Sequence, residues 1–287
     1  MRQKMIAFLL LGLCLFLVAM AVVVGLWCFG DIRPEEPIRT EEDLVYEMDD
    51  RGDRVKEPEI PGERVIPERD SAVIPEQSVA ADGEYFADAA FLVNSVSMGL
   101  SMYDYDGLLT RADFYGVEKL SAFEALDFIR DMEGGDYGKV YISLGINELW
   151  RDMDALRACY MEMLEELMGY SNDSIIVLVS VPPVSAYRSS TNANYTGELV
   201  AEYNEMLRTL AEDWGVWYLD VHSVLADEEG YLPSPVTEDG IHFTPAHYQL
   251  WFEHLASHYI NDGTVETELL PAEAEAMEAG QLPVSEP

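Results

Sequence analysis

The middle of the sequence, residues 84–260, predicts an α/β domain built on a parallel sheet. Short runs rich in Val, Ile and Leu alternate there with longer stretches of helical periodicity. Such runs are typical of parallel strands, which helices cover on both faces of the sheet. Ligands of these sheets bind beyond the carboxyl ends of the strands, so the residues that follow each strand are the first candidates for a functional site.

Five strands and four helices are expected in this domain. The strands are expected at residues 89–93, 112–115, 139–144, 174–181 and 216–221. The helices are expected at residues 121–132, 152–168, 196–214 and 245–260. Two helix starts are supported by capping residues: Ser121 and Glu124 form a capping box, and Thr244 precedes a proline at the first helical position.

The N-terminal region contains an apolar run that is long enough to cross a membrane. Residues 5–29 carry no charge and would extend about 37 Å as a helix, at ~1.5 Å per residue, whereas a hydrocarbon core is about 30 Å thick. A cleaved signal peptide is the alternative, but the run continues past the possible cleavage signal Ala19-Met-Ala21. Arg2 and Lys4 precede the run, so the positive-inside rule predicts a single-pass anchor within residues 1–30, a cytoplasmic N-terminus and an extracytoplasmic domain.

Two acidic segments flank the predicted domain. Residues 31–83 are rich in Glu, Asp, Arg and Pro and show no sustained period of 2 or 3.6. Residues 262–287 are rich in Glu, Ala and Pro. Neither segment can bury enough apolar surface to offset the loss of chain entropy. We therefore expect a disordered stalk and a disordered tail on either side of a domain of residues 84–261.

The charge of the chain argues against one class of partner. The sequence has 54 acidic and 17 basic residues, which gives a formal net charge of -37. Nucleic acids bind to clustered Lys and Arg, so no nucleic-acid partner is expected. Cysteine usage adds one limit: Cys14 and Cys28 lie in the apolar N-terminal run, which leaves Cys159 without a partner for an internal disulfide.

Polar residues with complementary chemistry follow the strand ends or precede the last helix. Ser95 follows the first strand, Asn147 follows the third, and Asp239 and His242 precede the last helix. A histidine can remove the proton of a serine hydroxyl, a carboxylate can fix the histidine tautomer, and an amide can stabilise an oxyanion. Each residue taken alone is better explained as a turn or packing residue. Their coincidence in this order favours a catalytic site.

Two motifs among these residues resemble those of a known family. Leu144-Gly-Ile-Asn-Glu148 and Asp239-Gly-Ile-His-Phe-Thr-Pro245 are similar to blocks of the SGNH hydrolases, also called GDSL-type esterases or lipases. The resemblance covers residues 85–260. It implies a flavodoxin-like three-layer α/β/α sandwich and a reaction that needs no metal or organic cofactor.

The resemblance also implies a role for each candidate residue. The nucleophile of the family falls on Ser95, and its oxyanion amide falls on Asn147. The general base falls on His242, with Asp239 as the residue that orients it. These four residues form the predicted catalytic site.

The sequence departs from the family pattern at two places. The first block usually reads Gly-Asp-Ser, whereas this chain has Val93-Asn94-Ser95; because Asn is nearly isosteric with Asp, we expect the turn to be kept. The second block normally supplies an oxyanion N–H from a glycine, and the matching residue here is Lys119. Lysine has a steric cost in backbone conformations that glycine adopts freely. Whether Lys119 or the nearby Gly116 supplies this N–H is left open by the sequence.

These observations predict a membrane-tethered, extracytoplasmic serine esterase. Small-molecule esters or O-acetylated and otherwise acylated envelope glycans are the expected substrates, and the same residues could transfer the acyl group to an acceptor other than water. The alternative is a relative with impaired catalysis that binds a glycan or a partner protein in the same pocket, because the first two blocks are altered. Retained ester turnover separates the two hypotheses.

Overall fold

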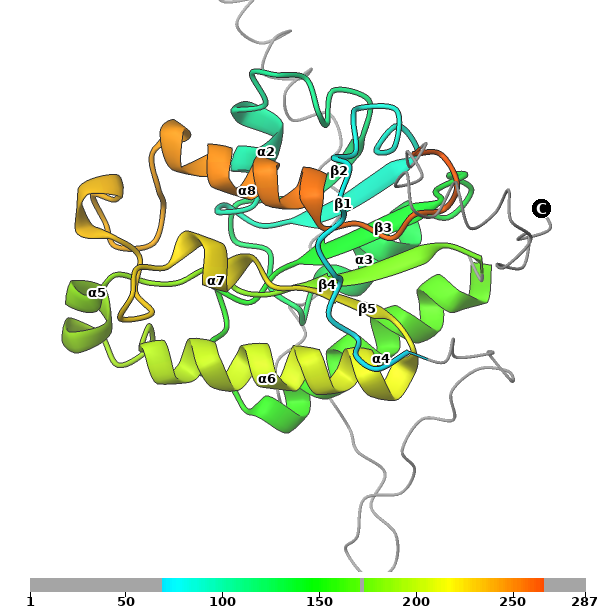
Figure 1. Cartoon of the computed structure of the whole chain (residues 1–287). Helices are drawn as coiled ribbons and strands as arrows, with labels where there is room; N and C mark the ends of the chain where they lie inside the picture. Colours follow the sequence, from blue (N-terminus) through cyan, green and yellow to red (C-terminus); the bar gives the residue numbers. More distant parts are fainter. Residues whose placement is uncertain (1–68, 171–172, 266–287) are drawn as a thin grey trace, which may run out of the picture. The chain divides into compact units, whose positions relative to one another are not determined.

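The sheet of the computed structural model has five parallel strands, as the sequence predicts (Figure 1). The structure describes residues 69–170 and 173–265. The strands are β1 (Ala89–Val93), β2 (Asp113–Gly116), β3 (Lys139–Ser143), β4 (Ile175–Val179) and β5 (Trp217–Leu219). Their order is β2-β1-β3-β4-β5, which is the flavodoxin-like order that the family resemblance implies.

Strand β1 lies between β2 and β3, and all of its residues are buried. Its Phe91 stacks on Phe114 of β2 and on Tyr141 of β3, with ring centroids 5.1 and 4.5 Å apart. The connections that leave β1 and β3 run in opposite directions across the sheet. The carboxyl ends of β1 and β3 therefore form the switch point of the sheet, where proteins of this architecture bind ligands.

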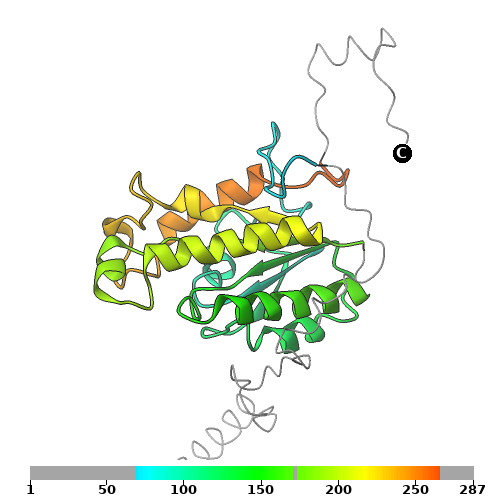
Figure 2. The same ribbon diagram turned by 90° about the horizontal axis from the view of Figure 1, so that it is seen from below.

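Helices cover both faces of the sheet (Figures 1 and 2). One face carries α3 (Ala125–Asp131), α4 (Met153–Tyr170) and α6 (Gly197–Trp214), and the other carries α2 (Gly99–Met102), α7 (Val221–Leu225) and α8 (Pro245–Ser257). Right-handed crossovers produce this division, because the chain crosses the sheet in one direction from β1 to β2 and in the opposite direction from β2 to β5. Two short helices, α5 (Ala186–Thr191) and the 3₁₀ helix η1 (Ser234–Val236), lie in loops.

The helices differ from the predicted ones in number and in their limits. The sequence missed the short helices α2, α5 and α7, which are one or two turns long and have little room for a periodic pattern. Helix α3 begins at Ala125 instead of residue 121. The Ser121 hydroxyl donates to Glu124 Oε2 at 2.6 Å, and residues 122–124 form turns ahead of the helix. Thr244 does precede Pro245 at the first position of α8, as predicted.

Residues 69–83 belong to the folded domain, although the sequence placed them in the stalk. The Ile74 N–H donates to the carbonyl oxygen of Tyr218 at 2.9 Å, and the Tyr218 N–H donates to the carbonyl oxygen of Ala72 at 2.9 Å. This pairing adds the segment to the free edge of β5. Ala72, Ile74 and Ala81 are buried, and the N–H groups of Gln77 and Ala81 donate to carbonyl oxygens at the end of α8, so backbone pairing and a few apolar side chains hold the segment.

The other end of the domain also extends past its predicted limit. Lys139, at the start of β3, is buried, and its ammonium group pairs with Asp88 at 2.8 Å and with Asp262 at 2.7 Å. It also lies 4.4 Å from the ring centroid of Tyr85. Asp262 was assigned to the disordered tail, but it is one of two carboxylates that neutralise a buried cation. The predicted domain of residues 84–261 is thus too short at both ends.

The predicted membrane anchor within residues 1–30 lies outside the described residues. The same holds for the stalk up to residue 68 and for the tail from residue 266. None of the helices within residues 69–170 and 173–265 is long and apolar enough to cross a membrane.

Replacing Asp262 tests its pairing with the buried lysine. Asp262→Asn is expected to lower the free energy of unfolding by about 1–2 kcal/mol at pH 7, because Lys139 keeps only one carboxylate. Burial tends to raise the pKa of Asp262, but hydrogen bonds from Lys139 and Thr264 bring it below the usual 3.8. This contribution is therefore present above pH 3.8 and is lost as the pH falls further.

Urea titrations of both proteins at pH 7 and pH 3 measure the difference. Asp136→Asn, at an exposed position before β3, is the matched control. An equal loss of stability from the two substitutions at pH 7 would contradict the pairing.

Candidate active site

A tight turn after β1 presents Ser95. Asn94 is buried, and its Oδ1 accepts the N–H groups of Val96 at 3.1 Å and Ser97 at 3.4 Å. The Ser97 hydroxyl donates to the carbonyl oxygen of Ser143 at the end of β3, which ties the turn to the neighbouring strand. Residue 94 contributes an acceptor oxygen to this turn, and the side chain of Asn provides one as that of Asp does. The asparagine therefore supports the turn, as the sequence predicts.

His242 lies against the serine. Its Nε2 is 2.9 Å from Ser95 Oγ, and its Nδ1 is 2.7 Å from Asp239 Oδ2. A carboxylate accepts hydrogen bonds only, so Nδ1 of a neutral imidazole carries the proton. Nε2 is then the acceptor of the Ser95 hydroxyl proton, which is the arrangement required of a general base.

The loop before α8 holds the aspartate in place. Asp239 Oδ1 accepts the backbone N–H groups of Ile241 and His242, both at 2.9 Å. The Thr237 hydroxyl accepts the N–H of Gly240 at 2.9 Å and donates to the carbonyl oxygen of His242 at 2.7 Å, which closes the turn. Burial tends to raise the pKa of Asp239, but the backbone N–H groups of Ile241 and His242 and the His242 ring lower it to about 2. The carboxylate is therefore ionised throughout the neutral range.

Asn147 lies in the loop after β3 and faces the loop after β2. Its side-chain amide donates to the carbonyl oxygen of Leu120 at 3.0 Å and to that of Glu118 at 3.3 Å. The backbone N–H of Ser95 donates to the same Glu118 oxygen at 3.0 Å. The Asn147 amide, which was predicted to bind an oxyanion, and the Ser95 N–H thus converge on one point, and a carbonyl oxygen of the protein occupies that point.

The structure also bears on the two open choices for a further N–H donor. Gly116 is the last residue of β2, with φ +141°, and a Cβ there would lie 1.9 Å from the carbonyl oxygen of Val93. Close packing between β1 and β2 therefore explains this glycine. Lys119 shares a trans peptide group with the Glu118 carbonyl, so its N–H points away from the two donors when the carbonyl oxygen points toward them.

Glu148 is a buried residue of the site to which the sequence assigned no role. Its Oε1 accepts the N–H of Ala122 at 3.0 Å and the hydroxyl of Tyr203 at 3.1 Å. It therefore ties the loop after β2 to the loop that carries Asn147. Burial raises the pKa of Glu148 to about 7, although these hydrogen bonds act in the opposite direction. The signal in the sequence is an acidic residue within the apolar stretch that ends at Trp150.

An aromatic cluster extends from this loop. Trp150, three residues after Asn147, packs edge-on against Tyr195 with ring centroids 5.9 Å apart. The Arg188 guanidinium group lies 5.2 Å from the Tyr195 ring centroid. Arg188 also packs against Gly240: a Cβ added to Gly240 would lie 2.7 Å from the Cβ of Arg188. The cluster thus joins the loop of the amide to the loop of the histidine.

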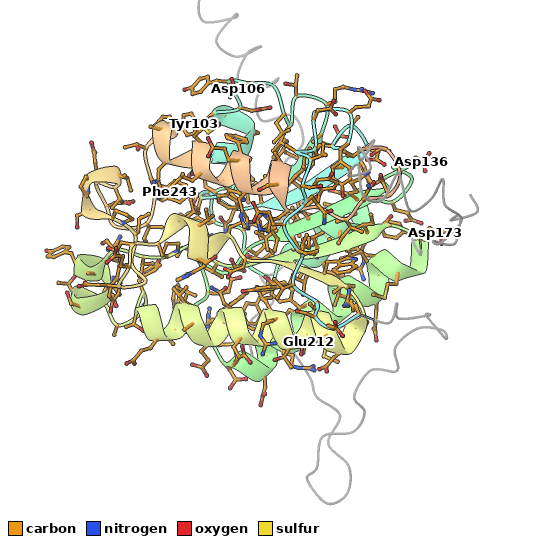
Figure 3. The ribbon with its side chains drawn as sticks, viewed as in Figure 1. Tyr103, Asp106, Asp136, Asp173, Glu212 and Phe243 are labelled. Atoms are coloured by element: carbon orange, nitrogen blue, oxygen red, sulfur yellow. The ribbon has the colours of Figure 1, made fainter. Side chains whose placement is uncertain are left out.

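These residues gather at one edge of the sheet. Phe243, the neighbour of His242, lies at the opposite end of the domain from Asp136 and Asp173, which precede β3 and β4 (Figure 3). The site is therefore at the carboxyl edge of the strands, as the sequence predicts. A serine, a histidine and an oriented carboxylate in this arrangement have the form of the triad found in serine hydrolases.

The chain belongs to the GDSL-like lipase/acylhydrolase family. Residues 80–250, more than half of the 287 residues, match the model of that family. No curated protein matches the chain.

Solved structures show a similar fold. A protein from Streptococcus pneumonia named as a candidate platelet activating factor is 20% identical, with a TM-score of 0.52 over 58% of this chain and 81% of that chain. A GDSL-like lipase from Bacteroides thetaiotaomicron is 17% identical, with a TM-score of 0.48 over 59% and 85% of the respective chains. At 20% identity the first of these likenesses concerns the fold alone.

Replacing Glu148 is expected to change the pH dependence of stability. A carboxyl group whose pKa is raised from 4.5 to about 7 binds its proton more tightly in the folded state. Its contribution to stability is therefore fully present below pH 4.5 and is lost as the pH rises to 7, a change of roughly 3 kcal/mol. Glu148→Gln does not titrate, so its melting temperature minus that of the natural protein should rise between pH 4 and pH 8.

Thermal unfolding followed by circular dichroism gives this difference at each pH. Glu253→Gln, an exposed position on α8, serves as the control. A difference for Glu148→Gln that stays constant with pH would show that the folded state does not retain the proton.

Proposed function

We propose that the chain is a serine-dependent acyl-ester hydrolase. The observation that carries the proposal is the continuous hydrogen-bonded chain from Ser95 Oγ through His242 to Asp239, with steps of 2.9 and 2.7 Å. Membership of the GDSL-like lipase/acylhydrolase family supports the same reaction class.

In the proposed reaction, Ser95 Oγ attacks the carbonyl carbon of an ester while its proton passes to His242 Nε2. Asp239, ionised at neutral pH, stabilises the imidazolium that forms. The carbonyl oxygen becomes an oxyanion, and the bond to the alcohol then breaks as His242 returns the proton to the leaving oxygen. Water repeats the sequence on the acyl-serine and releases the acid. An alcohol in place of water would give acyl transfer.

Asn147 is suited to bind the oxyanion because its amide has two N–H bonds: one can fix the side chain while the other donates to the oxyanion. One N–H, to the carbonyl oxygen of Leu120, holds the side chain in orientation. The other points to the position where it meets the Ser95 N–H. Loss of one such donor typically costs about 3–4 kcal/mol of transition-state stabilisation.

The proposed setting is the outer face of a membrane. Residues 5–29 form an uncharged run that follows Arg2 and Lys4, which supports a single-pass anchor with the hydrolase domain outside the cytoplasm. A tethered esterase at that position would reach acylated glycans of the cell envelope. The aromatic cluster beside the site supports a carbohydrate substrate, because exposed aromatic rings pack against the apolar faces of sugars; Trp150 is 41% exposed.

One observation favours a second candidate function. The carbonyl oxygen of Glu118 occupies the position between the two oxyanion donors, which would disable catalysis if it stayed there. The chain would then be a relative that binds a glycan or a partner protein without cleaving an ester.

Chemical labelling separates the two candidates. The full-length protein is expected to react with a fluorophosphonate probe at Ser95, and mass spectrometry locates the label. Ser95→Ala should take up no label, and His242→Ala should lower ester turnover by about 10²-fold or more, since the general base is lost. Ser101→Ala, at an exposed serine on α2, is the control that should keep both activities. A folded protein without label at Ser95 would favour the binding function.

The aromatic cluster predicts a difference between substrates. Trp150→Ala should raise the KM for an acetylated glycan by about 2- to 12-fold, since ring contacts of this kind are worth about 0.5–1.5 kcal/mol. The KM for p-nitrophenyl acetate, which lacks a sugar, should change little. Steady-state kinetics with both esters measure this, and Tyr105→Ala, at an exposed aromatic outside the cluster, is the control. Equal changes for both esters would argue against sugar contact.

A further inference from the structure

The oxyanion position is filled by a main-chain atom that can move. The carbonyl oxygen of Glu118 accepts the Ser95 N–H at 3.0 Å and the Asn147 amide at 3.3 Å. An oxyanion formed on a substrate bonded to Ser95 Oγ needs these same donors. Catalysis with this backbone conformation would therefore require the substrate to displace the carbonyl oxygen.

The Glu118 carbonyl belongs to the central peptide of a β-turn. The N–H of Leu120 donates to the carbonyl oxygen of Val117 at 3.0 Å, which closes the turn around Glu118 and Lys119. Both ends of the turn are fixed: Gly116 pairs with Val93 in the sheet, and the Leu120 carbonyl accepts from Asn147. Residues 117–119 are exposed. The central peptide can therefore rotate while the rest of the turn stays in place.

We infer that the Glu118–Lys119 peptide opens and closes the oxyanion hole by a flip of its plane. In the closed state, which the structure shows, the carbonyl oxygen binds the two donors. In the open state the oxygen points away, and the Lys119 N–H of the same trans peptide turns toward the position of the oxyanion. The inference rests on the proposed ester hydrolysis and makes the Lys119 N–H a further donor to the oxyanion.

The side chain at position 119 sets the balance between the two states. Type I and type II turns share the closing hydrogen bond and differ by a flip of the central peptide. Type II requires positive φ at the third residue, which is Lys119 here, whereas type I accepts ordinary residues there. A residue with a Cβ pays for positive φ, and glycine does not. Lysine therefore favours the type I orientation of the central peptide, whereas glycine would allow both the type I and the type II orientation.

A graded set of variants at position 119 tests this. The rate constant for phosphonylation of Ser95 by a fluorophosphonate and kcat/KM for p-nitrophenyl acetate should both increase in the order Lys119→Ala, Lys119→Asn, Lys119→Gly, because Asn adopts positive φ more readily than Ala. Lys119→Gly should exceed Lys119→Ala by about 5- to 30-fold. All three variants lack the lysine charge, so the order isolates the backbone effect.

Two measurements keep the result decisive. Melting temperatures show that each full-length variant is folded. Asp136→Gly and Asp136→Ala, at an exposed position distant from the site, should have equal rates, which excludes a general effect of a flexible loop. Equal rates for the three variants at position 119, with Ser95-dependent turnover in all of them, would overturn the flip and leave ester hydrolysis standing. Absence of labelling at Ser95 in every folded variant, Lys119→Gly included, would instead remove the proposed function and the flip with it.

Discussion

The position of β1 between β2 and β3 is the constraint on which the site depends. Parallel strands end at the same edge of a sheet, and these three strands are neighbours there. The turn with Ser95, the turn with Glu118 and the loop with Asn147 are therefore brought within hydrogen-bond distance of one another. Only the histidine and its carboxylate come from elsewhere, from the loop before α8, and a short turn carries both of them.

Two carboxylates near this edge differ in pKa because their environments differ. Asp239 receives two backbone N–H groups and a ring nitrogen, which keep it ionised with a pKa of about 2. Glu148 is fully enclosed, and burial raises its pKa to about 7. Asp239 can stabilise a developing positive charge, whereas Glu148 serves as a link between two loops. The difference follows chiefly from burial, which is complete for Glu148 and outweighs its hydrogen bonds, whereas the hydrogen bonds of the partly exposed Asp239 outweigh its burial.

The pattern of apolar residues in the sequence was sufficient to predict the strands of the sheet, but it was not sufficient to predict where the domain begins and ends. Strands β1, β3 and β4 are mostly buried apolar runs, and the shorter β2 and β5 were predicted as well although β2 is not buried. Strand β1 has the predicted limits of residues 89–93. The start at residue 84 was wrong, because Ala72 and Ile74 are too few to stand out among polar neighbours. Asp262 was missed for a related reason: a charged residue in an acidic tail gives no sign that a buried lysine pairs with it.

The sequence alone determined the fold class, the family resemblance and the residue types of the site, since these depend on local pattern and on short motifs. The hydrogen-bonded order of Ser95, His242 and Asp239 was implied by the motifs, and the structure gives it geometry. Only the tertiary structure decided that the carbonyl oxygen of Glu118 faces the donors of the oxyanion hole. The direction of a peptide plane depends on the groups it meets, and here those groups are the Ser95 N–H and the Asn147 amide, in the loops after β1 and β3 and more than 20 residues away on either side of the turn in the sequence.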